Sequence, residues 1–171
     1  MNVLQISTLY PPNIVGGAEI SAAEFAKYLM SQNHNVSVMT LKSKFNVESH
    51  SDEKNIFSVR PHLRYWPFRS KKFPRFVRVI WHVLDIWSVA IAIRTLIIVK
   101  QHSINLIITH NVTGLSLAPW TIAKLMKIPL VHIIHDYNLL CFRSTLWKNG
   151  FNCEQLCKSC KIRKIASNRS W

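Results

Sequence analysis

The sequence predicts an α/β fold: an open, mostly parallel sheet with helices on both of its faces. Three observations support this fold class. Short apolar runs of strand length alternate with longer segments whose apolar residues recur at helical spacing. The first strand, helix and strand form a crossover unit, which makes the two strands parallel. A length of 171 residues with 49% apolar side chains suits a domain with its own core.

Each element follows from a local pattern. The apolar run at 3–6 gives the first strand, and the prolines and glycines after it exclude a helix. Glu19 lies in the first turn of the next helix, where an acid complements the helix dipole. Thr113 or Ser116 can cap the last helix, and Pro119 is tolerated near its start. The predicted order is a strand at 3–6, a loop at 10–17, a helix up to 32, a strand at 36–39, a loop at 42–55, a strand at 56–59, a basic loop at 60–75, a long helix at about 75–102, a strand at 106–108, a helix reaching 127 and a strand at 130–134.

The most apolar stretch, Val79–Val99, belongs to the predicted long helix. It contains His82, Asp85 and Arg94, and a charge near the centre of a bilayer is costly. We therefore expect a core helix, or a helix that touches a membrane or a partner along one face, rather than a membrane span.

The net charge of +14 comes from 22 Lys and Arg against 8 Asp and Glu. Such a charge favours anionic partners, and eight acids exclude a carboxylate-rich site. The charge is uneven, because residues 60–78 and 143–171 each contain seven basic side chains and together only one acid, Glu154. The sequence therefore predicts basic surface segments rather than an evenly charged surface.

Polar loops follow three of the predicted strands, at 11–17, 109–114 and 135–138. The carboxyl ends of parallel strands are where ligands bind in open sheets, so these loops are expected to meet at one cleft. Gly16 and Gly17 precede a helix, whose free N–H groups attract a phosphate, although two glycines also simply make a turn. The spacing is not that of a dinucleotide fingerprint.

Two histidines occupy equivalent positions after different strands. His110 precedes Asn111, and His135 precedes Asp136. A single strand-end histidine often only bonds to loop carbonyls, but two favour a site for a polar ligand. Asp136 can orient a histidine or bind a hydroxyl. His132 is interpreted as structural or exposed, and no serine-nucleophile motif supports hydrolysis.

Three motifs occur in series along the chain. The first runs from Tyr10-Pro-Pro to Gly16-Gly-Ala-Glu19 and continues as Gln-Asn-His-Asn-Val-Ser-Val at 32–38. The second is Asn-Leu-Ile-Ile-Thr-His-Asn at 105–111, and the third is Ile-Pro-Leu-Val-His-Ile-Ile-His-Asp-Tyr at 128–137. Together, over residues 2 to about 161, they resemble the N-terminal domain of family-4 retaining glycosyltransferases of the GT-B type.

The chain departs from the family pattern at several positions. The family usually has Gly-His-Glu-Val in the first motif, where this chain has Asn33 and Asn35 for Gly and Glu. In the second motif Asn105 replaces an Asp and Ile108 replaces the first of two histidines. Lys127 stands where the family has a Gly before the third motif.

The resemblance implies an N-terminal, acceptor-side half of a GT-B fold, Rossmann-like, at 1–140, followed by a basic Cys-bearing segment at 141–171 that ends without a donor domain. It implies transfer of a sugar from a nucleotide-sugar donor with retention, to a polysaccharide or lipid-linked acceptor, without a catalytic metal. A missing or separate C-terminal domain would supply most donor contacts, so the chain alone is expected to be inactive. The residues that match the family's motifs and strand-end loops give His110 as catalytic and Gly16, Gly17, Glu19, Asn111, His135, Asp136 and Tyr137 as substrate-binding.

The amino terminus has no basic region before an apolar run, so we expect a cytoplasmic protein. In that compartment the four cysteines are metal ligands or thiols more readily than disulfides. Their spacing allows a structural zinc site, with free thiols and disulfides as open alternatives. The candidate ligands are Cys141, Cys153, Cys157 and Cys160.

Residues 60–78 interleave Arg and Lys with five aromatic side chains. That mixture suits an anionic membrane surface, although a solvated basic face is the plainer interpretation. We hypothesise peripheral contact with the inner face of the cell membrane. The alternative functions are a basic, zinc-dependent nucleic-acid-binding module and an inactive scaffold remnant. No nucleic-acid motif supports the former, so no nucleic-acid partner is expected.

Overall fold

The fold was analysed in a computed structural model of the chain. The structure describes residues 1–42, 55–60, 74–137, 139–141, 144–155, 160–161 and 164–165. The predicted loop at 42–55 and the basic loop at 60–75 therefore lie largely outside the described residues.

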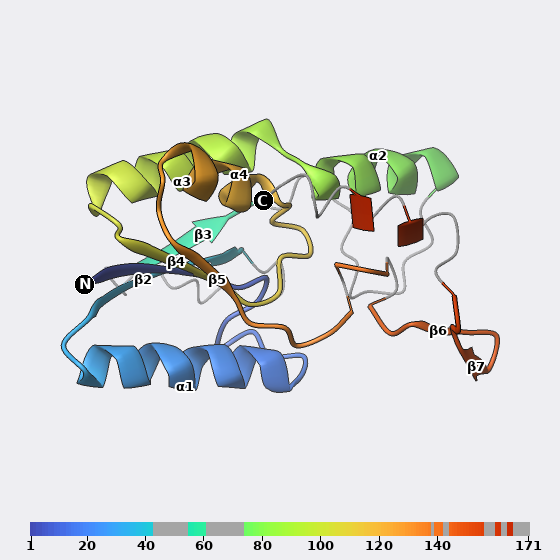
Figure 1. The fold of residues 1–171 in the computed structure, drawn as a ribbon, viewed down its shortest axis with the longest axis horizontal. Helices are drawn as coiled ribbons and strands as arrows, with labels where there is room; N and C mark the ends of the chain where they lie inside the picture. The colour runs from blue at the N-terminus through green and yellow to red at the C-terminus, as the bar shows by residue number, and fades with distance from the viewer. Residues whose placement is uncertain are drawn as a thin grey trace.

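A five-stranded parallel sheet forms the centre of the molecule, with the strand order β3-β2-β1-β4-β5 (Figure 1). The strands are β1 Asn2–Ile6, β2 Asn35–Leu41, β3 Ile56–Val59, β4 Leu106–Thr109 and β5 Leu130–His132. Each predicted strand is present, and β5 ends two residues earlier than expected. The open, parallel α/β fold predicted from the sequence is confirmed.

Helices cover both faces of this sheet. Helix α1 (Gly17–Ser31) lies on one face, and α3 (Val89–Gln101) and α4 (Ala118–Leu125) lie on the other (Figure 1). The larger core cluster joins Leu4 and Ile6 of β1 to the α3–α4 side. Gln5, between them, points to α1, where its Nε2 donates to the carbonyl of Ala22 at 2.6 Å. Alternate residues of one buried strand thus serve two different layers.

The prediction of one long helix at about 75–102 is wrong. The segment forms two helices, α2 (Arg75–Ile86) and α3, separated by the extended residues Trp87 and Ser88. In an uninterrupted helix the carbonyl of Ile86 would accept an N–H four residues later. It instead accepts the N–H of Leu117, at 3.1 Å, and the carbonyl of Ser88 starts the next helix. The helix is therefore interrupted at Trp87, and a tertiary hydrogen bond pairs the carbonyl that the interruption frees.

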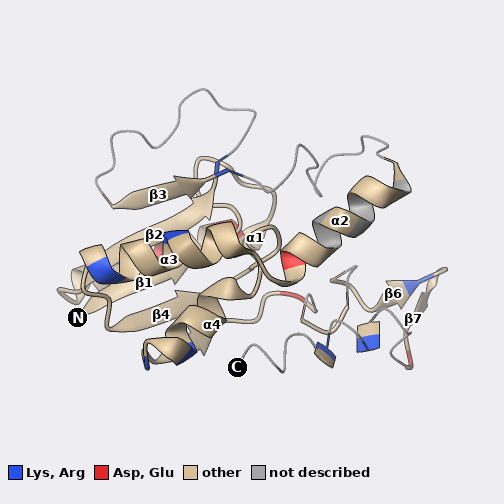
Figure 2. Ribbon diagram, turned by 90° about the horizontal axis from the view of Figure 1, so that it is seen from above, with Lys and Arg blue, Asp and Glu red and all other residues tan. Residues whose placement is uncertain are grey.

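Helix α2 extends past the sheet, on the side where the strands end (Figures 1 and 2). Its last turn is held by Asp85, which is 2% exposed and whose carboxylate accepts the N–H of Gly114. Among the described residues no helix is long and apolar enough to span a bilayer. The interpretation of Val79–Val99 as something other than a membrane span agrees with this finding.

The carboxyl-terminal segment contains a small hairpin that the sequence analysis did not predict. Strands β6 (Trp147–Lys148) and β7 (Phe151–Asn152) pair antiparallel. They are joined by Asn149 and Gly150, which both have positive φ angles, of 53° and 86°. Two such residues form a tight two-residue turn, whose backbone twist matches the twist of the two paired strands. The division of the chain at residue 140 stays a prediction.

Candidate functional site at the carboxyl ends of β4 and β5

A pocket lies where β4 and β5 end. It contains about 210 Å³ of space, part of it open to solvent. Two of the three predicted loops contribute to it, those that follow β4 and β5. The lining residues are His110, Asn111, Val112, His132, His135, Asp136 and Leu139. The sequence prediction of a site at these strand ends thus corresponds to a hollow in the structure.

His110 and His135 form the centre of this site. Nδ1 of His110 lies 2.9 Å from Nε2 of His135, and the two rings are nearly parallel, with an interplanar angle of 18°. His110 is only 1% exposed, whereas His135 is exposed. Phe25 of α1 packs edge-on against His110 from the other side, with ring centroids 6.1 Å apart. His110 is therefore enclosed between a helix and a second histidine.

Burial, with smaller contributions from the nearby His135 and His132, lowers the pKa of His110 from 6.5 to about 4. A low-dielectric environment disfavours the charged imidazolium, and positive neighbours act in the same direction. His110 is therefore neutral at physiological pH. One of its ring nitrogens then carries a hydrogen and the other has only a lone pair.

A second contact joins the same two loops one residue further on. The amide Nδ2 of Asn111 donates to the Oδ2 of Asp136 at 3.1 Å, and its Oδ1 accepts the N–H of Thr113 at 3.1 Å. Thr8, directly after β1, donates its hydroxyl to the carbonyl of Asn111 at 2.9 Å. Asn111 and Asp136 thus fix the loops against each other, and the segment after β1 supports them.

His132 belongs to the pocket although the sequence analysis interpreted it as structural or exposed. Its Nδ1 lies 2.9 Å from the hydroxyl of Thr109, and its ring packs edge-on against Trp120. Burial lowers the pKa of His132, while Asp136 raises it. The signal for its position is the strand register, because Thr109 and His132 are partners across the β4–β5 pair.

The glycine loop lies at the same edge of the sheet but does not line this pocket. Glu19 is buried, and its carboxylate accepts the N–H groups of Gly16 at 2.7 Å and Val15 at 3.3 Å. A Cβ built on Gly17 would meet nothing within 4 Å, and one on Gly16 would meet only the Glu19 carboxylate, at 3.9 Å. Packing of the described chain therefore does not require glycine at either position.

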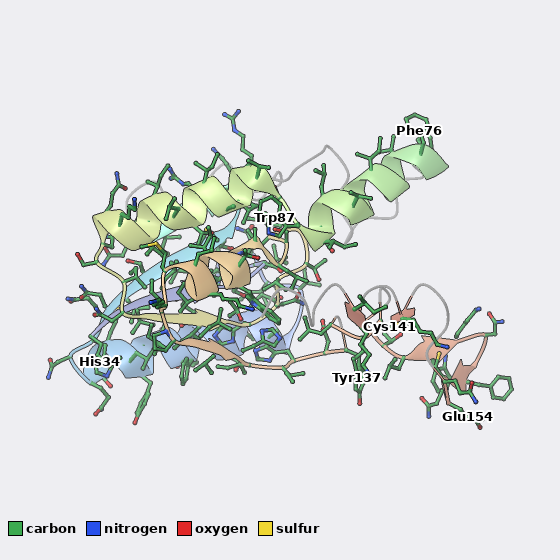
Figure 3. The ribbon with its side chains drawn as sticks, turned by 45° about the horizontal axis from the view of Figure 1, so that its top comes forward. His34, Phe76, Trp87, Tyr137, Cys141 and Glu154 are labelled. Atoms are coloured by element: carbon green, nitrogen blue, oxygen red, sulfur yellow. The ribbon has the colours of Figure 1, made fainter. Side chains whose placement is uncertain are left out.

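Tyr137 and Cys141 lie beyond the end of the sheet. Tyr137 points outward, and Cys141 is on the segment that leads to the hairpin (Figure 3). Cys141 and Cys160 are buried, Cys153 is partly buried, and none of the three is in a disulfide. Within the described ranges no three His, Cys, Asp or Glu side chains are grouped to hold a metal. Cys157 lies outside those ranges, so the zinc site stays a prediction.

Comparisons with known proteins give the family. The model of Glycosyltransferase Family 4 matches residues 15–157. An uncharacterized 42.6 kDa protein in the cps region of Klebsiella pneumoniae is 30% identical over 152 residues, which cover 88% of this chain and 40% of that protein. The chain therefore spans less than half the length of this relative.

Two solved structures are similar in fold. The crystal structure of MurG from Acinetobacter baumannii has a TM-score of 0.54 at 14% identity, with 90% of this chain and 43% of that chain covered. The UDP-GlcNAc 2-epimerase from Methanocaldococcus jannaschii has a TM-score of 0.50 at 10% identity, with 99% and 37% covered. These two likenesses show the fold alone. With the family match over most of its length, the chain belongs to Glycosyltransferase Family 4 and is an N-terminal domain of the GT-B type.

Proposed function

We propose that this domain works in a glycosyltransferase that transfers a sugar from a nucleotide-sugar donor to a polysaccharide or lipid-linked acceptor, with retention at the anomeric carbon. The observation that carries the proposal is the family match at 15–157, together with a pocket at the strand ends of the same fold. The cps region in which the Klebsiella relative lies favours a role in making a cell-surface polysaccharide.

A second Rossmann-like domain completes this enzyme in our proposal and supplies most of the donor contacts. The chain covers 40% of the Klebsiella relative and 43% of the MurG chain, which supports a partner domain of similar size. It is either a further part of the same protein or a separate chain. The 171 residues alone are then expected to be inactive.

The loop at Gly16–Gly17 is proposed to face the donor diphosphate. A helix N-terminus offers N–H groups and a favourable dipole to an anion. The absence of any packing demand for glycine at these positions supports the approach of a ligand to the backbone. Glu19 already accepts the N–H of Gly16, so we assign it to the shape of the loop rather than to the anion itself.

The pocket around His110 is proposed to orient the transferred sugar or the acceptor hydroxyl. Neutral imidazoles both donate and accept hydrogen bonds, and Asp136 is an acid beside them. No catalytic metal is needed in this scheme, because a positioned hydrogen-bonding surface can stabilise charge that develops on oxygen. Tyr137 is then expected at the rim of the site rather than inside it.

The test begins with the coding DNA downstream of this chain, which should encode a second Rossmann-like domain. The joined protein is incubated with a set of nucleotide-sugars and a lipid-linked acceptor, and nucleotide release is measured. Transfer with an unchanged anomeric configuration, read by NMR of the product, is the expected result. The 171-residue chain alone is the matched control. A joined, folded protein that releases no nucleotide from any donor would contradict the proposal.

We further propose that the enzyme binds the inner face of the cell membrane through helix α2. Phe76, Ile80, Val83 and Trp87 are each between 42% and 66% exposed. The spacing of Phe76, Ile80 and Val83, four and three residues, places these three on one side of the helix, and Trp87 follows as its extended C-cap residue. Figure 3 shows Phe76 at the end of α2 far from the sheet and Trp87 at the end near it. This apolar stripe is long for a surface of a water-soluble protein.

Charge supports an anionic bilayer as the proposed occupant of the stripe. Residues 74–101 contain Arg75, Arg78, Arg94 and Lys100, whereas their only acid is Asp85, which is buried. A helix with apolar side chains on one side and cations nearby binds the interface of anionic lipids. This surface also adjoins, in sequence, the basic aromatic segment 60–73.

Co-flotation with phosphatidylglycerol vesicles tests the membrane proposal. Partition should weaken as salt rises and should be much weaker with phosphatidylcholine. The double variant Phe76→Ser/Val83→Ser should lose about thirtyfold in partition or more, because each side chain contributes about 1–2 kcal/mol on burial. Tyr28→Ser, an exposed aromatic on the opposite face of the sheet, is the matched control and should bind like the parent. Equal binding to both vesicle types would refute the charge argument.

From the spacing of the four cysteines we also propose that they hold a structural zinc. Metal analysis after purification under reducing conditions should find one zinc per chain. Absence of zinc would reject it.

A further inference from the structure

The two histidines of the pocket differ in a way that their matching sequence positions do not indicate. His110 is only 1% exposed, and its Nε2 has no hydrogen-bond partner in the structure. His135 is exposed and covers His110 on the side toward the pocket. A ligand that enters from solvent therefore meets His135 first.

The nitrogen atoms can be assigned one by one. The 2.9 Å contact uses Nδ1 of His110 and Nε2 of His135, so a single hydrogen lies between these two atoms. If His135 donated it, neutral His110 would carry its own hydrogen on Nε2. That would be a buried N–H without a partner, which proteins avoid more strictly than a buried acceptor without one. The hydrogen between the rings therefore belongs to Nδ1 of His110.

We propose that His135 is the histidine that contacts the ligand, through its Nδ1–H, and that His110 is the positioning residue that fixes the tautomer of His135. The ligand atom is an oxygen acceptor, a sugar hydroxyl or a phosphate oxygen. This inference rests on the proposed function for the identity of the ligand, but the assignment of the two tautomers does not. It keeps His135 as a ligand-binding residue and changes His110 from the catalytic residue that the resemblance implies to a positioning residue.

The groups around the pair are consistent with this assignment. On the β5 side His132 acts electrostatically on His110 and Asp136 acts on His132, and on the α1 side the neutral Phe25 packs against His110. Asp136 is hydrogen-bonded to Asn111, one residue beyond the imidazole pair. Two neighbouring cross-links, 110 with 135 and 111 with 136, hold the loop after β5 in one register against the loop after β4. The direction of His135 is thus set by two contacts.

Histidine side-chain NMR of the ¹⁵N-labelled chain near neutral pH tests the tautomers directly. Neutral His135 should carry its hydrogen on Nδ1 and neutral His110 likewise. In His110→Leu the donor is lost, and His135 should shift toward the Nε2–H form. In His110→Asn the amide occupies the place of Nδ1 and can donate, so the Nδ1–H form should return. A parent His135 protonated on Nε2, or one tautomer in all three proteins, would overturn the assignment.

A separate experiment with three probes tests the ligand contact. Glucose 1-phosphate, methyl α-glucoside and inorganic phosphate are added separately at millimolar concentration, and the His135 Nδ1–H signal is followed. A shift with the glucoside identifies a hydroxyl oxygen, and a shift with inorganic phosphate identifies a phosphate oxygen. His135→Phe should bind the effective probe about tenfold more weakly, whereas Tyr28→Ser, exposed on α1 and outside the pocket lining, should bind it like the parent. If none of the three moves the signal, the contact is rejected while the tautomers stand. If the joined enzyme transfers no sugar, only the proposed function fails.

Discussion

Folding stability should depend on pH through His110, and a His110→Asn variant should reveal it. The imidazole of His110 is buried in the folded chain, with a pKa lowered to about 4. In the unfolded chain the same group has a pKa near 6.5. The unfolded state therefore binds more protons between these values, so the free energy of unfolding falls as the pH falls. The contribution of His110 is fully present above about pH 6.5 and is lost on the way down to about pH 4.

The size of the effect follows from the two pKa values. Between about pH 7.5 and about pH 5 the parent should lose roughly 2 kcal/mol of unfolding free energy through this one group. Near pH 4 the loss should approach roughly 3 kcal/mol. A neutral asparagine takes up no proton, so the variant should lack this part of the pH dependence. His132, whose pKa is also lowered, titrates in both proteins and cancels in the comparison.

Urea unfolding of the parent and of His110→Asn, each at about pH 7.5 and about pH 5, measures the difference. The expected result is a steeper loss of stability in the parent by about 2 kcal/mol. Phe25→Leu is the matched control, because it removes the ring that packs on His110 but keeps the imidazole. It should lower stability at both pH values and keep most of the pH dependence. Equal pH dependence in the parent and in His110→Asn would refute the reasoning about burial.

Three further substitutions test contacts that support the fold. Asp85→Ala should lower the free energy of unfolding by about 1–3 kcal/mol, because the N–H of Gly114 loses its acceptor, and Asp85→Asn should cost less since an oxygen remains. Trp120→Ala should cost about 3–5 kcal/mol in thermal or urea unfolding, since the ring is 2% exposed and its Nε1 donates to Thr109. Gly150→Ala should weaken the β6–β7 hairpin by about 1–2 kcal/mol because of its positive φ, and amide hydrogen exchange should show the effect in that hairpin and not in the main sheet.

The strands of the sheet could be predicted from sequence because their signal is local. Each is a short apolar run, and the run at 56–59 gave the bounds of β3 without error. The interruption at Trp87 and Ser88 could not be found in the same way. Apolar residues at helical spacing continue across it, and the carbonyl that it frees is paired with an N–H from Leu117, about thirty positions further along the chain. The β6–β7 hairpin is a different case, because Asn149-Gly150 is a turn signal that the sequence contained.

The candidate site shows the same division between local and tertiary information. The positions of His110 and His135 after two strands were enough to predict that they would meet, because parallel strands end at one edge. Which of them is covered depends on Phe25 of α1 and on the course of the loop after β5. His132 was missed because only the register of β4 and β5 places it opposite Thr109. Glu19 is in its predicted position, yet its carboxylate is occupied by loop amides.

The attachment of α2 gives the helix the properties of a spacer. The contacts that hold its end include those of Asp85 with Gly114, of Ile86 with Leu117 and of Trp87 with Thr121. All three partners belong to the stretch that leads directly out of the pocket loop. Twelve helical residues span about 18 Å, so a surface that binds Phe76 would stand about that far from the attachment point. The length of α2 would then set how far an acceptor must reach out of a bilayer to enter the pocket.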